Sequence, residues 1–288
     1  MMASFRDVIV GVDGREGGRD AIALGRLLVA PTGRLTLAHV REGGLAPPSA
    51  DDVAFEAEID AAPVAESQKL LEREREAAGV AAELIDVVDR HVGPGLHKLA
   101  ERERADLLVV GSCHRARWSR LLVGDDTRAS LDGATCAVAV APLGYGRDAG
   151  GMTRIGVGYN GSPESKNALA LARGLASAPG ATVRALRIAQ VPGPPFSPTG
   201  RSPVDTDVYE KEMAALDGVK GEVRFGFEDE ELAALSGEVD LLIVGSRSYG
   251  PLARLMLGST ARYLAEHARC PLIVLPRAAG SNADPADE

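Results

Sequence analysis

Short apolar runs rich in β-branched residues alternate along the chain with segments whose apolar residues recur at helical spacing. The first half of the chain contains the runs DVIVGV, RLTLAHV, AELIDVV, DLLVV and CAVAVA. Between the first two runs, one apolar helical face is formed by Ile22, Leu24, Leu27 and Leu28. Short apolar strands separated by helices are typical of parallel sheets with right-handed crossovers. The pattern therefore predicts an α/β fold.

The second half of the chain repeats the first. Residues 6–28 are similar to residues 153–175, and residues 106–142 are similar to residues 240–276. We therefore predict two tandem, doubly wound, Rossmann-like α/β domains, each with a five-stranded parallel sheet. The predicted organisation is a first domain over 1–142, a glycine-rich linker over 143–152, a second domain over 153–277 and a disordered tail over 278–288.

Composition and charge narrow the function classes. The 288 residues are 45% hydrophobic and 25% charged, which is ordinary for a globular protein. The net charge of −9 disfavours nonspecific nucleic-acid binding, which needs a basic surface. No apolar run is long enough for a membrane span, and the N-terminus lacks the residue order of a signal peptide. We therefore expect a cytoplasmic protein without a membrane or nucleic-acid partner.

Candidate chemistry is sparse. The 3 cysteines are too few and too scattered for a disulfide framework or a zinc site, and the 5 histidines show no metal-ligand spacing. The sequence contains no motif of the common hydrolases or metalloproteases. We therefore predict no catalytic residues and no metal ligands.

Candidate ligand-binding residues lie at the carboxyl ends of the predicted strands, where doubly wound folds bind ligands. These positions are Asp13, Val40 and Gly111 in the first copy, and Asn160, Ile188 and Gly245 in the second. In the second copy, VGSRSYGPLARLMLGSTARYL contains two glycine turns, and a helix could begin at Gly258-Ser259-Thr260. A helix start of this kind binds phosphate through its backbone N–H groups. We favour a phosphate site over the alternative of two unrelated tight turns.

With these motifs, the chain resembles the universal stress protein family in its tandem two-domain form. The resemblance covers both copies nearly end to end. Its most specific element is G-x-x-G, nine residues and G-S/T, combined with an acidic residue after the first strand. The resemblance implies that the glycine pattern holds the phosphates of ATP and that the acidic residue lies beside the ribose. It also implies no defined reaction, and at most a very slow ATPase.

The second copy departs from this pattern at two positions. Ser248 replaces the second motif glycine, and Asn160 replaces the acid after the first strand while keeping a hydrogen-bond acceptor. Arg247 matches the motif position and is a candidate phosphate contact. The predicted site for ATP, with Mg²⁺ left open, comprises Asn160, Ile188, Gly245, Arg247, Ser248, Gly258, Ser259 and Thr260.

The first copy departs more severely, because Gly124 is followed by Asp125 and Asp126 where phosphate would meet the helix start. Each of these carboxylates would repel a phosphate by about 1 kcal/mol or more. Asp13 keeps the acid of the pattern, although capping of a helix or tightening of a turn is an equal alternative. The weaker candidates of this domain are Asp13, Val40, Gly111 and Gly124.

Two hypotheses for function follow. The favoured one is a stress-response protein that binds ATP or a related adenine nucleotide, mainly in its second domain, and acts as a nucleotide-dependent regulator. The alternative is an interaction scaffold in which both nucleotide sites have decayed. A slow ATPase is a third reading, but the sequence shows no base or nucleophile for it.

The last apolar run of each copy, CAVAVAP or CPLIVLP, would leave an open strand edge in an isolated domain. This need for cover and the family resemblance predict an intrachain pseudo-dimer, joined through these strands about a pseudo-twofold axis. Pairing of two chains into a homodimer stays open. Cys136 and Cys270 precede the two strands at equivalent positions, and we expect both to be buried.

Overall fold

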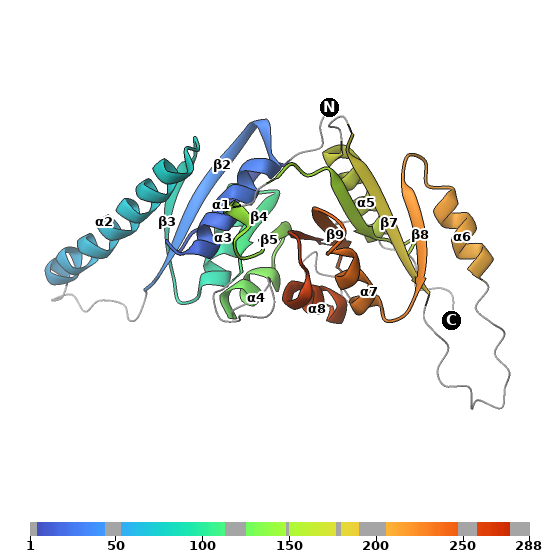
Figure 1. The fold of residues 1–288 in the computed structure, drawn as a ribbon. Helices are drawn as coiled ribbons and strands as arrows, with labels where there is room; N and C mark the ends of the chain where they lie inside the picture. The colour runs from blue at the N-terminus through green and yellow to red at the C-terminus, as the bar shows by residue number, and fades with distance from the viewer. Residues whose placement is uncertain are drawn as a thin grey trace, which may run out of the picture.

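The computed structural model describes residues 5–43, 53–112, 125–147, 150–176, 180–189, 206–246 and 258–276. The apolar runs of the first copy form its strands, so the predicted alternation of strands and helices is confirmed (Figure 1). The elements are β1 (Phe5–Gly11), α1 (Glu16–Leu28), β2 (Val29–Glu42), α2 (Val53–Ala78), β3 (Glu83–Asp89), α3 (Val92–Glu103), β4 (Leu107–Gly111), α4 (Asp125–Leu131) and β5 (Ala137–Ala141). The predicted tail lies outside the described residues.

The second copy repeats this order after a short 3-10 helix, η1 (Tyr145–Arg147). Its elements are β6 (Arg154–Gly158), α5 (Pro163–Leu175), β7 (Thr182–Ala189), α6 (Thr206–Ala214), β8 (Lys220–Phe225), α7 (Glu228–Leu235), β9 (Leu241–Gly245), α8 (Ser259–His267) and β10 (Leu272–Leu275). The largest difference between equivalent helices is at α6, which has 9 residues where α2 has 26.

The two predicted five-stranded sheets are joined into a 10-stranded sheet of order β3-β2-β1-β4-β5-β10-β9-β6-β7-β8. Strands pair in parallel within each half, whereas β5 and β10 pair antiparallel. At this junction Ala139 lies opposite Ile273, its own equivalent in the repeat. A local pseudo-twofold axis therefore passes between these two residues, and the predicted pairing of the last strands is confirmed.

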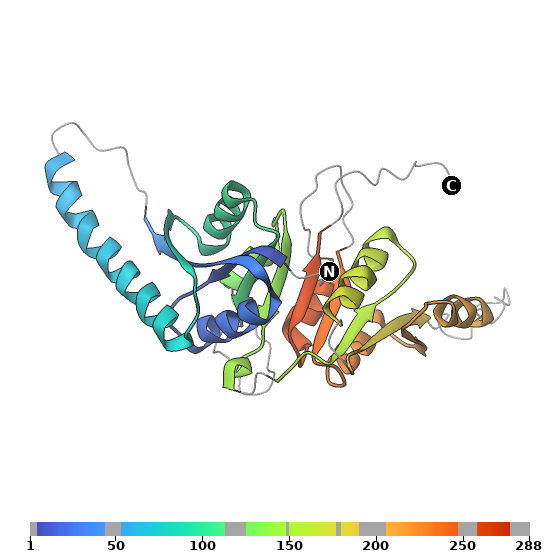
Figure 2. The same ribbon diagram turned by 90° about the horizontal axis from the view of Figure 1, so that it is seen from above.

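Helices cover both faces of the sheet (Figure 2). One hydrophobic core contains residues of α1, α2, α5 and α6, and the other contains residues of α3, α4, α7 and α8. Both cores run across the domain junction, because Ile273 of β10 points into the first and Leu272 into the second. On one face, α4 and α8 lie side by side (Figure 1), and Arg128 forms a 2.8 Å ion pair with Glu266. The junction is thus a shared core, not a loose tether.

The predicted linker is held against the first domain by a buried carboxylate. Asp20 of α1 is 2% exposed and accepts hydrogen bonds from the backbone N–H groups of Gly144 (2.8 Å) and Gly146 (2.7 Å). Burial raises the pKa of Asp20, and the two N–H bonds oppose that rise. In the described part of the chain, no helix is long and apolar enough to cross a bilayer.

Cys136 and Cys270 are buried, as expected from the sequence, and burial raises the pKa of each thiol to about 12. At pH 8 the thiolate fraction of such a group is on the order of one in ten thousand. We predict that a thiol-reactive dye at pH 8 does not modify these two cysteines in the folded protein and modifies both in denaturant. Peptide mapping of the labelled protein distinguishes them from Cys113, which lies outside the described residues. Rapid native labelling of either residue would contradict the packing at the strand junction.

Candidate functional site

A cavity of about 650 Å³ opens in the second domain at the carboxyl ends of β6, β7 and β9. It is lined by six of the eight residues predicted for the nucleotide site: Asn160, Ile188, Gly245, Gly258, Ser259 and Thr260. Arg247 and Ser248 lie outside the described residues. The strands bring these residues together because the carboxyl ends of parallel strands meet at one edge of a sheet.

The start of α8 forms one wall of this cavity. The helix begins at Ser259, as the sequence predicted, after Gly258 at its N-cap. Among the described residues, no side chain caps this end. The N–H groups of the first helical turn have no acceptor within the helix, and the helix dipole adds partial positive charge. This wall is therefore suited to an anion such as phosphate.

Asn160 forms the turn that follows β6. Its Oδ1 accepts the backbone N–H of Ser162 at 3.1 Å, and the Ser162 hydroxyl then caps α5 by accepting the N–H of Ser165 at 3.2 Å. Asn160 was predicted to offer an acceptor and donors to a ribose hydroxyl, and the turn already uses one lone pair of its Oδ1. The side-chain NH₂ group and the second lone pair of Oδ1 remain for a ligand hydroxyl.

The first glycine of each motif allows a helix to pack closely against a strand end. A Cβ atom on Gly245 would lie 2.5 Å from the Cβ of Glu164 in α5, and one on Gly111 would overlap the backbone of Gly17 in α1. Gly258 differs, because no described atom would lie within 4 Å of an added Cβ. Its φ of −63° is also open to any residue. Gly245 and Gly111 were predicted as ligand-binding residues, and the structure adds that both are needed for close packing of a helix.

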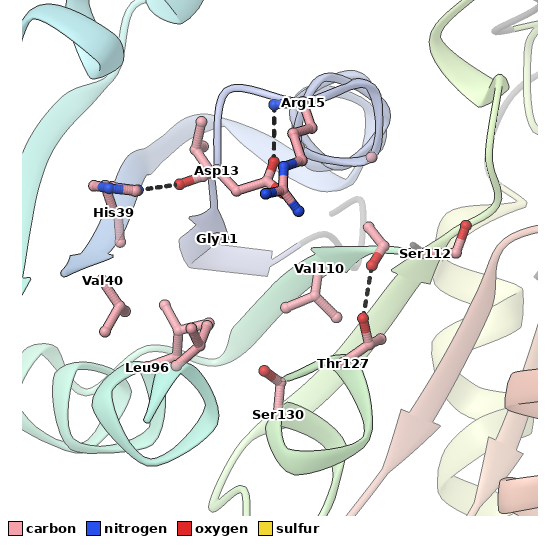
Figure 3. Close-up of a pocket in the computed structure, with 16 residues that line it drawn as sticks. Gly11, Asp13, Arg15, His39, Val40, Leu96, Val110, Ser112, Thr127 and Ser130 are labelled. Atoms are coloured by element: carbon pink, nitrogen blue, oxygen red, sulfur yellow. Dashed lines mark hydrogen bonds and ion pairs between the residues drawn. The ribbon is translucent and has the colours of Figure 1, made fainter. Parts of the chain in front are cut away.

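The equivalent cavity of the first domain is smaller, about 180 Å³ (Figure 3). Asp13, Val40 and Gly111 line it together, as predicted, whereas Gly124 lies outside the described residues. Val40 was predicted to end its strand, but β2 continues to Glu42. Leu96 and Val110 give the cavity an apolar floor beside Val40 (Figure 3).

Asp13 acts as a turn residue in the first cavity. Its Oδ1 accepts the backbone N–H of Arg15 at 3.0 Å, and the Arg15 guanidinium lies 3.9 Å from Oδ2 (Figure 3). Asp13 therefore tightens the turn after β1, which was one of the alternatives for this residue. The side chain of Asp13 is 54% exposed, so a contact with a ligand is not blocked.

Other lining residues were not identified from the sequence. In the first domain, Thr127 of α4 lines the cavity and donates its hydroxyl to the Gly111 carbonyl at 2.9 Å. In the second, Glu164, Tyr209 and Glu228 line the cavity. The described residues contain no cluster of three His, Cys, Asp or Glu side chains that could hold a metal ion.

Comparison with known proteins identifies the class that this fold and its paired sites define. The profile of the Universal stress protein family matches residues 4–142 and 152–276, so the chain belongs to this family and contains two of its domains. Universal stress protein Rv2319c of Mycobacterium tuberculosis (strain ATCC 25618 / H37Rv) is 25% identical over 235 residues, which cover 76% of this chain and 80% of that protein.

Solved structures agree with the fold. A universal stress protein from Archaeoglobus fulgidus DSM 4304 covers 96% of this chain and 100% of its own, with a TM-score of 0.65 and 19% identity. A universal stress protein in complex with cAMP is similar over 49% of this chain and 99% of its own, with 25% identity and a TM-score of 0.35. The first of these extends across both domains of the present chain.

Proposed function

We propose that this chain binds an adenine nucleotide, ATP or a close relative, mainly in its second domain, and that the bound nucleotide regulates its role in the stress response. The observation that carries the proposal is the convergence of Asn160, Gly245 and Gly258-Ser259-Thr260 on one cavity. These are the positions to which the family motif assigns ribose and phosphate. The start of α8 supplies N–H groups and a positive dipole end for the phosphates.

The difference between the two cavities supports placing the nucleotide in the second domain. Ligand pockets commonly have volumes of about 300–1,000 Å³. The second cavity, at about 650 Å³, is within this range, and the first, at about 180 Å³, is below it. The helix that should bind phosphate in the first domain, α4, also begins with Asp125 and Asp126. Cavity size and the uncharged start of α8 therefore favour the second domain, although Glu164 and Glu228 also line its cavity.

The proposal requires binding but no reaction. A regulator needs its ligand to favour one state of the protein over another. Helix α8 connects the proposed phosphate position to the domain junction, because it begins at Ser259 and Glu266 in its last turn pairs with Arg128 of α4. Phosphate at α8 is thus placed to alter the packing of the two domains, or the surface that they offer to a partner.

Mass spectrometry of small molecules released from freshly purified protein tests the proposal. We expect an adenine nucleotide at close to one per chain, or, if the site empties during purification, saturable binding of Mg-ATP at one site by calorimetry. Neither retained nucleotide nor binding of ATP, ADP, AMP or cAMP would overturn the proposal and favour the interaction scaffold.

A further inference from the structure

Two tyrosines are among the described residues that line the second cavity: Tyr159, which is 6% exposed, and Tyr209 of α6, which comes from the side of the sheet order away from α8. The strand order β9-β6-β7-β8 places Gly245 at one end, Asn160 next to it, and Ile188 of β7 beyond that. Helix α6 packs on β7 and β8, so Tyr209 lines the cavity beyond the Asn160 turn. A nucleotide with its phosphates at α8 and its ribose at Asn160 would thus extend its base toward Tyr209.

Arg187 of β7 holds one face of the Tyr209 ring, next to the turn that contains Asn160. The guanidinium carbon of Arg187 lies 4.1 Å from the ring centroid, and Arg187 donates a 2.8 Å hydrogen bond to Glu212 of the same helix. Arg187 does not contribute to the cavity lining, whereas Tyr209 does. Met213, one helical turn after Tyr209, is 2% exposed and anchors α6 in the core. The ring is therefore preorganised, with part of its surface turned to the cavity.

Aliphatic side chains face this region from the other side of the sheet. Ile188 and Leu232 of α7 line the cavity and pack in the core opposite to that of Met213. The Tyr209 ring and these aliphatic groups line the same cavity, which suits the packing of a flat, uncharged group against them. The described residues of the first domain show no counterpart of the Tyr209–Arg187 pair. None of the described residues of α2 lines the first cavity, and His39 of β2 stands at the position of Arg187.

We propose that Tyr209 is the base-stacking residue of the second domain, so that this site selects ligands with an aromatic base over phosphate chains alone. This inference rests on the proposed function and deepens it. Stacking on a ring face tolerates any base, so Tyr209 supplies affinity for the base as a class. Discrimination between adenine and guanine is not its role.

The test compares two ligands on three full-length variants. Calorimetry measures Mg-ATP, and phosphorus NMR measures tripolyphosphate, which has the phosphates without base or ribose. We expect Tyr209→Ala to lower Mg-ATP affinity about 10-fold, the order expected for loss of one base–aromatic stack. Tripolyphosphate affinity stays unchanged. Tyr209→Phe keeps Mg-ATP affinity, because stacking uses the ring and not the hydroxyl.

Val208→Ala is the matched control, since Val208 is the neighbouring residue on α6, is 57% exposed and does not line the cavity. It should change neither affinity. Unchanged Mg-ATP binding in Tyr209→Ala, or equal losses for ATP and tripolyphosphate, would overturn the stacking role while leaving the proposed function standing. Failure of the unmodified protein to bind Mg-ATP would instead overturn the proposed function and this inference with it.

Discussion

Gly258→Asp is expected to lower the affinity of the second domain for Mg-ATP by at least about 100-fold, or about 2.7 kcal/mol. The substitution places at the N-cap of α8 the kind of carboxylate that begins α4 in the first domain. A carboxylate there would occupy the partial positive charge of the helix start and repel the phosphates of the nucleotide. Calorimetric titration of the full-length chain measures the effect.

Gly258→Asn is the matched control, because asparagine has the size of aspartate without its charge. Both residues are favourable N-caps, so neither variant should unfold the domain. No described atom lies within 4 Å of an added Cβ at this position, and asparagine controls for the size of the aspartate side chain. We expect Gly258→Asn to keep most of the affinity. Equal loss in both variants would mean that loop shape, and not charge, controls the site.

The reverse substitution should create nucleotide binding in the first domain. Asp125→Ser with Asp126→Thr gives α4 the Gly-Ser-Thr start of α8 and removes two negative charges from the predicted phosphate position. In a full-length chain whose second site is silenced by Gly258→Asp, we expect Mg-ATP affinity to rise at least about 10-fold, or about 1.4 kcal/mol. Calorimetry of the chain before and after the double substitution measures the gain.

Restoration should be partial, because the first cavity is smaller and none of the described residues that line it is a tyrosine, phenylalanine or tryptophan. Asp125→Asn with Asp126→Asn, in the same silenced chain, separates removal of charge from addition of hydroxyl groups. If charge is the main obstacle, the two asparagines should give most of the gain. No gain in either double variant would show that the loop before α4, and not its carboxylates, closes the first site.

The strands and the tandem repeat were predictable because they follow from hydrophobic periodicity and internal similarity. The pairing of β5 with β10 was predictable from the need to cover strand edges together with the family resemblance. The helix start at Gly258-Ser259-Thr260 was predictable for a similar reason, since glycine followed by small hydroxyl residues is a local signal of a helix N-terminus. Six predicted residues of the second site therefore line one cavity.

Features that depend on contacts between distant segments were not predictable. The packing role of Gly245 requires knowing that α5 presents Glu164 to the end of β9. The hydrogen bond that Asn160 Oδ1 accepts from the Ser162 N–H uses part of the acceptor capacity on which a ligand contact would depend. Tyr209 was missed because α6 is the helix in which the two copies differ most, so the repeat offers no counterpart. The placement of the Tyr209 ring also depends on Arg187, which lies in β7 and not in α6.

The central claim is that one nucleotide binds per chain, with its phosphates at the start of α8. A crystal structure of the full-length protein grown with Mg-ATP tests this most directly. The account predicts one nucleotide whose phosphates contact the N–H groups of Gly258, Ser259 and Thr260. It predicts no nucleotide at the start of α4, where Asp125 and Asp126 lie. A nucleotide held only in the first domain, or equally in both, would contradict it.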